Sequence, residues 1–220
     1  MNTQLFPPWR QRLVRSLHLN RSQPQSRYYQ VATVDGSGLP KNRTMVFRGF
    51  EDGNDNLLSI TDRRSEKIID WQEQENKTFE LCWYFAKSRE QYRVSGRAKL
   101  LFASDLPKYT AGEAENSQLI KTWIELSQNA QQAFYLDTPK TPFCDNSEIS
   151  DIQGSDNNKL STNIKKTNIN NAEVIRNISE NFVLVSFIAE SVDYLNLRAT
   201  PHERLLSDKS QSWQERKVFA

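Results

Sequence analysis

The stretch from residue 43 to residue 67 constrains the fold of this chain more than any other. Two apolar runs typical of strands, 43–50 and 56–61, flank a polar turn that contains Gly53. Cationic side chains stand near the end of each run, and the second run leads directly into a helical pattern over 64–74. This order favours an antiparallel sheet with a helix packed against it.

Similar strand signals recur along the rest of the chain. Phe79, Leu81, Trp83 and Phe85 alternate along one strand, which forms a hairpin with the next strand through a turn at 87–89. Six or more short strands with a few peripheral helices predict an α+β fold, a small antiparallel β-barrel. The other expected strands are 28–34, 77–86, 91–102, 181–191, 192–198, 203–206 and 213–219, and the other expected helices are 8–19 and 105–133.

The composition bounds the number of domains. A chain of 220 residues with 37% hydrophobic residues can bury one substantial core, so a single domain over 1–220 is expected. Residues 145–177 are rich in Asn, Asp, Ser, Lys and Thr and contain no aromatic residue. Such a segment buries too little apolar surface to offset its ordering entropy, so it is predicted to be a mobile insertion.

Charge and cysteine content exclude several classes of protein. There are 29 basic and 27 acidic residues, and a net charge of +2 gives no argument for nucleic-acid or membrane partners. Cys82 and Cys144 are far apart and are interpreted as free thiols in a reducing compartment. No secretory signal is evident, and no apolar run approaches the roughly 20 residues that span a bilayer. A cytoplasmic location is expected.

The junction of the second strand and its helix carries groups that suit a phosphate. A helix start presents free N–H groups and the positive end of its dipole, and the hydroxyls of Thr61 and Ser65 can donate there. Lys67 and Arg43 would supply positive charge. With the apolar strands beside it, this set favours flavin mononucleotide (FMN), a flat ring with a phosphate tail. The alternative is an ordinary capped helix start with solvated cations.

The sequence leaves open the roles of two further polar residues, Arg48 and Gln91. Arg43 and Arg48 are five residues apart, so they lie on opposite faces of a regular strand unless a bulge intervenes. The amide of Gln91 can both donate and accept, which suits the edge of a flavin pyrimidine ring. Taken alone, Gln91 is equally well explained as an edge-strand polar group.

Taken in order, these motifs resemble the pyridoxamine 5'-phosphate oxidase family, over about 26–126 and again from 192 to the C-terminus. The resemblance implies an FMN-binding split β-barrel that forms a homodimer, with each FMN contacted by both subunits. Tyr194 falls where the family has a tryptophan beside the flavin. The cofactor-binding residues implied are Arg43, Thr44, Met45, Val46, Thr61, Ser65, Lys67, Gln91, Tyr194 and Arg204.

The chain departs from the family pattern in the substrate set. Glu113 and Thr200 stand where the family has substrate-binding arginines, and a carboxylate repels a phosphate dianion. Glu66 likewise replaces an arginine of the cofactor-phosphate site, a cation that Arg63 or Arg64 could supply instead. The substrate-binding residues that the resemblance implies are Arg48, Tyr109, Ser117 and His202.

The function implied is that of an FMN-dependent oxidoreductase, in which a small substrate exchanges a hydride with the flavin. His202 is the candidate catalytic residue, to orient substrate or move a proton. Two alternatives stay open: a non-catalytic flavin-binding protein, and an oxidoreductase whose substrate is not a B6 phosphate. A fold that binds no flavin and acts as an interaction module is a third.

Overall fold

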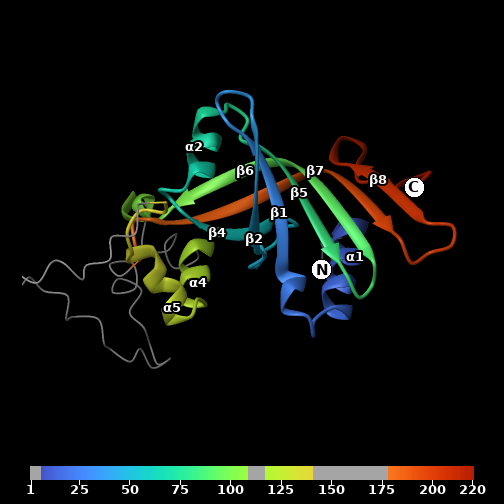
Figure 1. Ribbon diagram of the computed structural model, residues 1–220, viewed down its shortest axis with the longest axis horizontal. Coiled ribbons are helices and arrows are strands. Elements are labelled where there is room, and N and C mark those ends of the chain that lie inside the picture. The colour runs from blue at the N-terminus through green and yellow to red at the C-terminus, as the bar shows by residue number, and fades with distance from the viewer. Residues whose placement is uncertain (1–5, 109–116, 141–177) are drawn as a thin grey trace, which may run out of the picture.

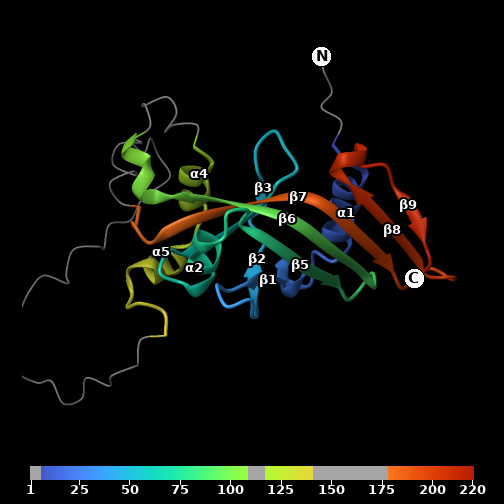
Figure 2. The same ribbon diagram turned by 90° about the horizontal axis from the view of Figure 1, so that it is seen from above.

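A computed structural model describes residues 6–108, 117–140 and 178–220, and Figures 1 and 2 show them from two sides. The strands are β1 (Tyr28–Val34), β2 (Pro40–Val46), β3 (Gly49–Phe50), β4 (Leu57–Asp62), β5 (Thr78–Phe85), β6 (Glu90–Phe102), β7 (Phe182–Asn196), β8 (Glu203–Asp208) and β9 (Arg216–Val218). The α-helices are α1 (Pro8–Leu19), α2 (Glu66–Glu73), α4 (Gln118–Ile124) and α5 (Gln128–Gln132). Short 3₁₀ helices are η1 (Pro24–Arg27), η2 (Ala103–Lys108), η3 (Ala133–Tyr135) and η5 (Lys209–Gln211).

The strands form one antiparallel sheet that curls into a split barrel (Figure 1). Its order is β2, β1, β5, β6, β7, β4 and β3, while β8 and β9 extend from β7. The barrel closes where β2 meets β4. There the Ser59 hydroxyl donates to the Val46 carbonyl at 2.6 Å, and the Arg48 N–H donates to the Leu58 carbonyl at 2.8 Å. The α+β antiparallel split barrel that the sequence predicts is confirmed.

The inward faces of the strands and one face of α1 fill the barrel core. Trp83 and Tyr92 are fully buried, and the Trp83 ring stacks on Phe85 with 5.2 Å between the ring centroids. Trp9 and Leu13 of α1 are 1% and 0% exposed, so the helix packs directly on this core. Burying each such side chain contributes roughly 1.5–3 kcal/mol.

Strand β7 is buried on both faces over its first six residues, 182–187. Phe187 faces the barrel core, whereas Leu184 faces a second cluster that contains Trp123 of α4. Burial on both faces removes the polar–apolar alternation that marks a half-exposed strand. The expectation of two strands, 181–191 and 192–198, is therefore wrong: the structure has one strand of 15 residues.

The predicted strand 43–50 is divided in the structure. Strand β2 pairs with β1 as far as Val46, whereas Gly49 and Phe50 pair with β4. The chain changes partner at Arg48, and Gly49 has a φ of +130°, which strongly favours glycine. This switch carries the chain across the split, so Arg43 and Arg48 do not share one regular strand.

The single helix expected over 105–133 is also wrong, because the chain forms η2, α4, α5 and η3 in this region. Ser127 ends one helical pattern and caps the next, its hydroxyl accepting the Ala130 N–H at 3.3 Å. Residues 109–116 lie outside the described chain.

Other predictions are confirmed. Helix α1 and strand β1 have the predicted bounds, and β5 and β6 form the predicted hairpin. Cys82 is a free cysteine, while Cys144 and the predicted insertion 145–177 lie outside the described residues. Within the described ranges no helix has the length and apolar character needed to cross a membrane.

Candidate functional site

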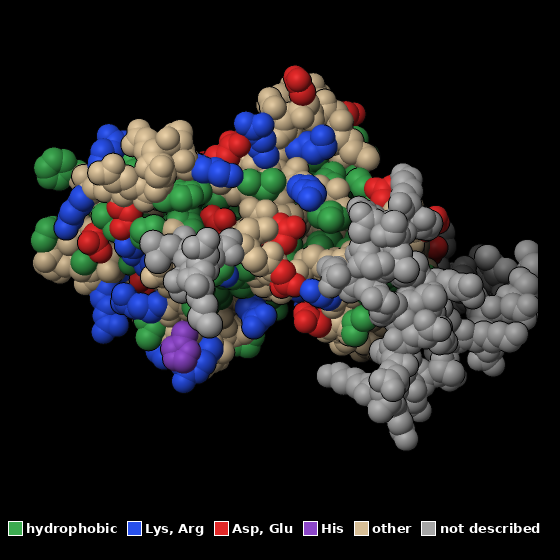
Figure 3. All heavy atoms as spheres, turned by 180° about the vertical axis from the view of Figure 1, so that it is seen from behind, with side chains coloured by type: hydrophobic (Ala, Val, Ile, Leu, Met, Phe, Trp, Pro, Cys, Tyr) green, Lys and Arg blue, Asp and Glu red, His purple; other side chains and the backbone are tan. Residues whose placement is uncertain are grey.

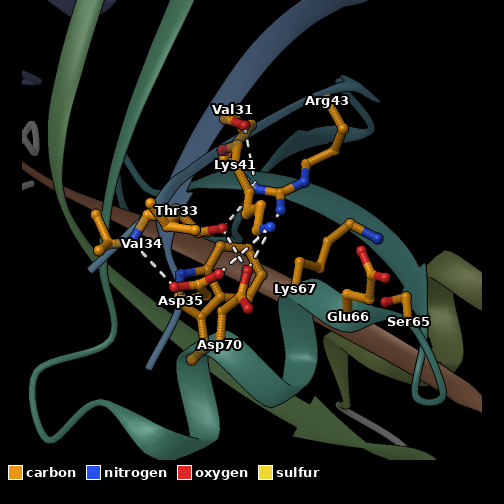
Figure 4. A network of polar contacts seen from close by, with 12 residues as sticks. Val31, Thr33, Val34, Asp35, Lys41, Arg43, Ser65, Glu66, Lys67 and Asp70 are labelled. Atoms are coloured by element: carbon orange, nitrogen blue, oxygen red, sulfur yellow. Dashed lines mark hydrogen bonds and ion pairs between the residues drawn. The ribbon is translucent and has the colours of Figure 1, made fainter. Parts of the chain in front are cut away.

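Four of the predicted cofactor residues meet where β2, β4 and α2 converge. Arg43 comes from β2, Thr61 from the end of β4, and Ser65 and Lys67 from the start of α2. The Lys67 ammonium donates to Thr61 Oγ1 at 2.8 Å, and Thr61 Oγ1 lies 3.2 Å from Ser65 Oγ. Figure 4 shows Arg43, Ser65 and Lys67 around the start of this helix. These four residues are called the phosphate cluster below.

Positive charge in the phosphate cluster is only partly neutralised. Burial, together with the nearby charge of Arg43, lowers the pKa of Lys67 from 10.5 to about 8. Among the described residues Lys67 has no ion-pair partner, and its hydrogen-bond acceptor is a neutral hydroxyl. A half-buried ammonium beside a guanidinium would be stabilised by a dianion, so the cluster has the donor chemistry of a phosphate site.

A buried triangle of polar groups holds Arg43 in place. Its Nη1 donates to Thr33 Oγ1 at 2.7 Å, and its Nη2 lies 3.4 Å from Asp70 Oδ2. The Thr33 hydroxyl also donates to Asp70 Oδ2, at 2.6 Å. Asp70 is 6% exposed, so this anchoring is sheltered from solvent. Sequence reasoning missed both partners, although Asp70 lies three residues after Lys67 and therefore on the same helix face.

Glu66, at the position where the resemblance implies an arginine, is paired with a residue that the sequence did not point to. Lys140 forms an ion pair with it and lowers its pKa. Arg64 is unavailable for this role, because its Nε and Nη2 donate to Asp62 at 3.0 and 2.7 Å. Arg63 lies over the ring of Phe102. Neither arginine joins the phosphate cluster.

Gln91 and Arg204 belong to a second group, on the outer face of the sheet. Gln91 pairs with Leu195, and Leu195 pairs with Arg204, so the three residues form one row across β6, β7 and β8. Two strand spacings separate the ends of this row, about 10 Å. Asp193 accepts from Arg204 Nε and Nη2 at 3.0 and 2.7 Å. Gln91, Leu195 and Arg204 are called the outer row below.

Tyr194 does not belong to the outer row. It is 3% exposed and faces the core, where its hydroxyl donates to Glu90 Oε1 at 2.7 Å. Its ring lies 5.0 Å from that of Tyr92 and under the guanidinium of Arg12. Successive residues of a strand point to opposite faces, so Leu195 is the one beside Gln91. Within the described chain Tyr194 is a core residue, and its place beside a flavin stays a prediction.

The other predicted cofactor residues divide between the two faces of β2. Met45 is 5% exposed and belongs to the barrel core. Thr44 and Val46 alternate with it, and Thr44 is exposed on the outer face opposite Gln30. Figures 1 and 2 place α2 and β8 toward opposite ends of the molecule. One chain therefore does not bring the phosphate cluster and the outer row together.

The predicted substrate residues are likewise dispersed. Arg48 lies on the surface just after β2, Ser117 is the residue before α4, and His202 is exposed before β8. Thr200, at the position where the resemblance implies an arginine, is exposed in the same loop as His202. Tyr109 and Glu113 lie outside the described residues.

Comparison with known proteins gives the family. Residues 6–102 match the family model described as pyridoxamine 5'-phosphate oxidase, FMN-binding domain. A protein of Arabidopsis thaliana named pyridoxine/pyridoxamine 5'-phosphate oxidase 2 is 34% identical over 192 residues, which cover 87% of this chain and 84% of the relative. A Legionella pneumophila pyridoxine/pyridoxamine 5'-phosphate oxidase is 31% identical over 40% of this chain and 39% of its own length.

Solved structures of similar proteins have the same fold. A pyridoxamine 5'-phosphate oxidase-related, FMN-binding protein of Nostoc punctiforme superposes with a TM-score of 0.73 at 30% identity, over 97% of each chain. PhzG of Burkholderia lata shares the fold, with a TM-score of 0.57 at 13% identity over 100% of this chain and 95% of its own. The chain belongs to the pyridoxamine 5'-phosphate oxidase family.

Proposed function

We propose that this protein binds FMN and acts as an oxidoreductase of the pyridoxamine 5'-phosphate oxidase type. The observation that carries the proposal is the phosphate cluster, in which Lys67 and Arg43 lie close together and no carboxylate of the described residues pairs with Lys67. Thr61 and Ser65 add hydroxyl donors beside them. Two cations and two hydroxyls fit the charge and the acceptor oxygens of a phosphate monoester.

The residues have separable tasks in this proposal. Lys67 and Arg43 hold the phosphate, and the buried Thr33–Asp70 pair keeps the Arg43 guanidinium oriented. When bound, the flavin supplies the hydride chemistry. His202 is proposed to orient the substrate or move a proton, and its exposure before β8 leaves it free to face a bound molecule.

A homodimer completes the proposed site. One chain holds the phosphate cluster and the outer row far apart, so a second copy of the chain would supply the outer row for the flavin held by the first. Its amide and guanidinium donors suit the oxygen and nitrogen edge of the ring. In a twofold dimer the same exchange occurs twice, which gives two equivalent sites.

The first experiment identifies the bound molecule. We expect the purified protein to be yellow, and acid or heat to release FMN at one molecule per chain, identified by its mass. A colourless protein that takes up no FMN on titration would overturn the proposal.

A mixing experiment tests the shared site. The variant pair Lys67→Ala with Arg43→Ala removes the phosphate cluster, and the pair Gln91→Ala with Arg204→Ala removes the outer row. Each variant alone should bind FMN poorly. An equimolar mixture with random subunit exchange should regain roughly a quarter of its sites, because about half of its dimers are mixed and each mixed dimer has one intact site. No recovery in mixtures shown to exchange subunits would contradict a site built from two chains.

Thr200 supports the second candidate, a flavin-binding protein without B6 oxidase activity, because it provides no cation where the family resemblance leads one to expect an arginine. Anaerobic addition of pyridoxamine 5'-phosphate discriminates between the two. Bleaching of the flavin absorbance supports the oxidase. An unchanged spectrum, with the flavin still reducible by dithionite, supports the second candidate.

A further inference from the structure

Four charged residues alternate in sign across the outer face of the sheet, one on each of the neighbouring strands β5, β6, β7 and β8. Glu80 of β5 pairs with Arg93 of β6 at 2.8 Å, and Arg93 lies 3.7 Å from Asp193 of β7. Asp193 pairs in turn with Arg204 of β8, through contacts of 2.7 and 3.0 Å. These four residues are called the charge ladder below, and Arg204, at its end, also belongs to the outer row.

Strand register explains how the charge ladder reaches the outer row. Arg93 is directly opposite Asp193, whereas Arg204 is opposite Leu195, two residues further along β7. Residues two apart on a strand share a face, so Arg204 reaches Asp193 diagonally. The Asp193 side chain is 19% exposed, against 33% for Arg204 and 43% for Arg93. Asp193 is therefore the most sheltered of these groups, with a guanidinium on each side of it.

Folding stability gives little reason for the charge ladder. Exposed ion pairs contribute little to stability, and Figure 3 shows acidic and basic side chains interspersed over the face of the molecule that it draws. Opposite charges beside one another are thus common on this surface. What sets the charge ladder apart is its end, because Arg204 is the one charged residue of the outer row and both nitrogens that hold it in place donate to Asp193.

The charge beside a flavin ring is important because reduction changes the charge of the ring itself. A neutral ring that accepts a hydride gains one negative charge, which spreads over its pyrimidine edge. A free guanidinium at that edge would stabilise this charge and make the ring easier to reduce. Arg204 is not free: Asp193 accepts from its Nε and Nη2, so the pair has no net charge. Its Nη1 has no acceptor among the described residues and can still donate.

We propose that Asp193 is a positioning residue that orients Arg204 and cancels its charge where Arg204 faces the flavin in the shared site. The inference rests on the proposed function and deepens it, because it names a residue that sets the reduction potential of the bound flavin. With Asp193 in place, the outer row offers the ring hydrogen-bond donors without a net positive charge. The oxidised, neutral ring is then favoured, and the reduction potential is lower than a free guanidinium would give.

The test measures the reduction potential of the flavin bound to each variant, after removal of unbound FMN. Asp193→Asn leaves Arg204 unpaired, so the affinity for reduced FMN relative to oxidised FMN should rise about tenfold, which is about 30 mV for a two-electron couple. Arg204→Gln leaves the carboxylate of Asp193 at the same place, and the potential should fall below that of the parent protein. Asp193→Glu keeps the charge and should stay near the parent value. Loss of a purely structural contact would not move the two halves of one pair in opposite directions.

Glu190→Gln is the matched control, because Glu190 pairs with Arg97 at 2.8 Å on the same strand but outside the outer row. Its reduction potential should equal that of the parent protein. The inference alone is overturned by an unchanged potential in Asp193→Asn, by shifts of the same sign in Asp193→Asn and Arg204→Gln, or by an equal shift in Glu190→Gln. A chain that takes up no FMN would overturn the proposed function and this inference with it, so the two failures are distinguishable.

Discussion

The phosphate cluster and the outer row carry similar residue types but differ in how their charge is balanced. Lys67 is half-buried and has no carboxylate partner among the described residues. Arg204 lies on the sheet surface and is bound through two nitrogens to Asp193. The first region therefore favours a charged ligand group, whereas the second favours neutral hydrogen-bonding groups. A molecule with an anionic tail and a neutral polar ring matches both.

The largest expected effect comes from emptying the phosphate cluster. Arg43→Ala with Lys67→Ala removes two charge-assisted contacts of about 1.5–3 kcal/mol each, so FMN affinity should fall by roughly 10²–10⁴-fold. Titration of FMN into flavin-free protein, followed by fluorescence quenching, measures this. Arg204→Ala should cost much less, because Asp193 pairs with Arg204 through two short contacts, whereas Arg43 is only 3.4 Å from Asp70 and Lys67 has no ion pair among the described residues. Equal losses in the two regions would break the comparison.

A pH titration tests the charge state of Lys67. Its pKa of about 8 means that the flavin-free site loses this proton between pH 7 and 9. A phosphate monoester stays a dianion there, since its second pKa is about 6. FMN affinity should therefore fall about tenfold for each pH unit above 8 until the pKa of the complex is reached. Lys67→Arg keeps its charge and should flatten the profile.

The lowered pKa of Lys67 makes folding stability change with pH in the opposite direction to FMN affinity. The folded value, about 8, lies below the ordinary value of 10.5, so charging Lys67 disfavours folding at low pH. For flavin-free protein this cost should disappear as pH rises from 8 to 10.5. The difference in unfolding free energy between Lys67→Met and the parent protein isolates it. A difference that does not shrink over this window would contradict a lowered pKa.

Tyr194 and Leu195 test the face assignment at the outer row. Tyr194→Phe removes the hydroxyl donor to buried Glu90 and should lower the unfolding free energy by about 1–3 kcal/mol, with flavin affinity unchanged. Leu195→Asp should weaken flavin binding severalfold, with a smaller effect on stability. Denaturant unfolding and FMN titration of both variants measure the two quantities. A loss of flavin affinity in Tyr194→Phe without one in Leu195→Asp would contradict the proposal that the outer row contacts the flavin.

The smallest expected effect concerns Glu66. Glu66→Gln removes an exposed carboxylate from the edge of the phosphate cluster and should tighten FMN binding about two- to threefold at low salt. The gain should fade as added salt screens surface charges, at ionic strengths above about 0.15 M. Glu75→Gln, a carboxylate beyond the other end of α2, is the control. A gain that persists at high salt would point to a structural cause instead.

Local patterns determined much of the fold. Helix α1, strand β1 and the β5–β6 hairpin follow from periodicity and turn residues that act within a few positions of one another. Three members of the phosphate cluster, Thr61, Ser65 and Lys67, lie within seven consecutive residues. Their proximity follows from one strand-to-helix turn, so the sequence sufficed to find them.

Contacts between distant segments decided the rest. Burial of β7 on both faces, the change of pairing partner at Arg48, and the anchoring of Arg43 by Thr33 and Asp70 all depend on how the barrel closes. Strand register decided that Leu195 rather than Tyr194 joins Gln91, because a shift of one residue reverses the face of a side chain. Such outcomes depend on pairing and burial across the whole sheet, and no local stretch of residues encodes them.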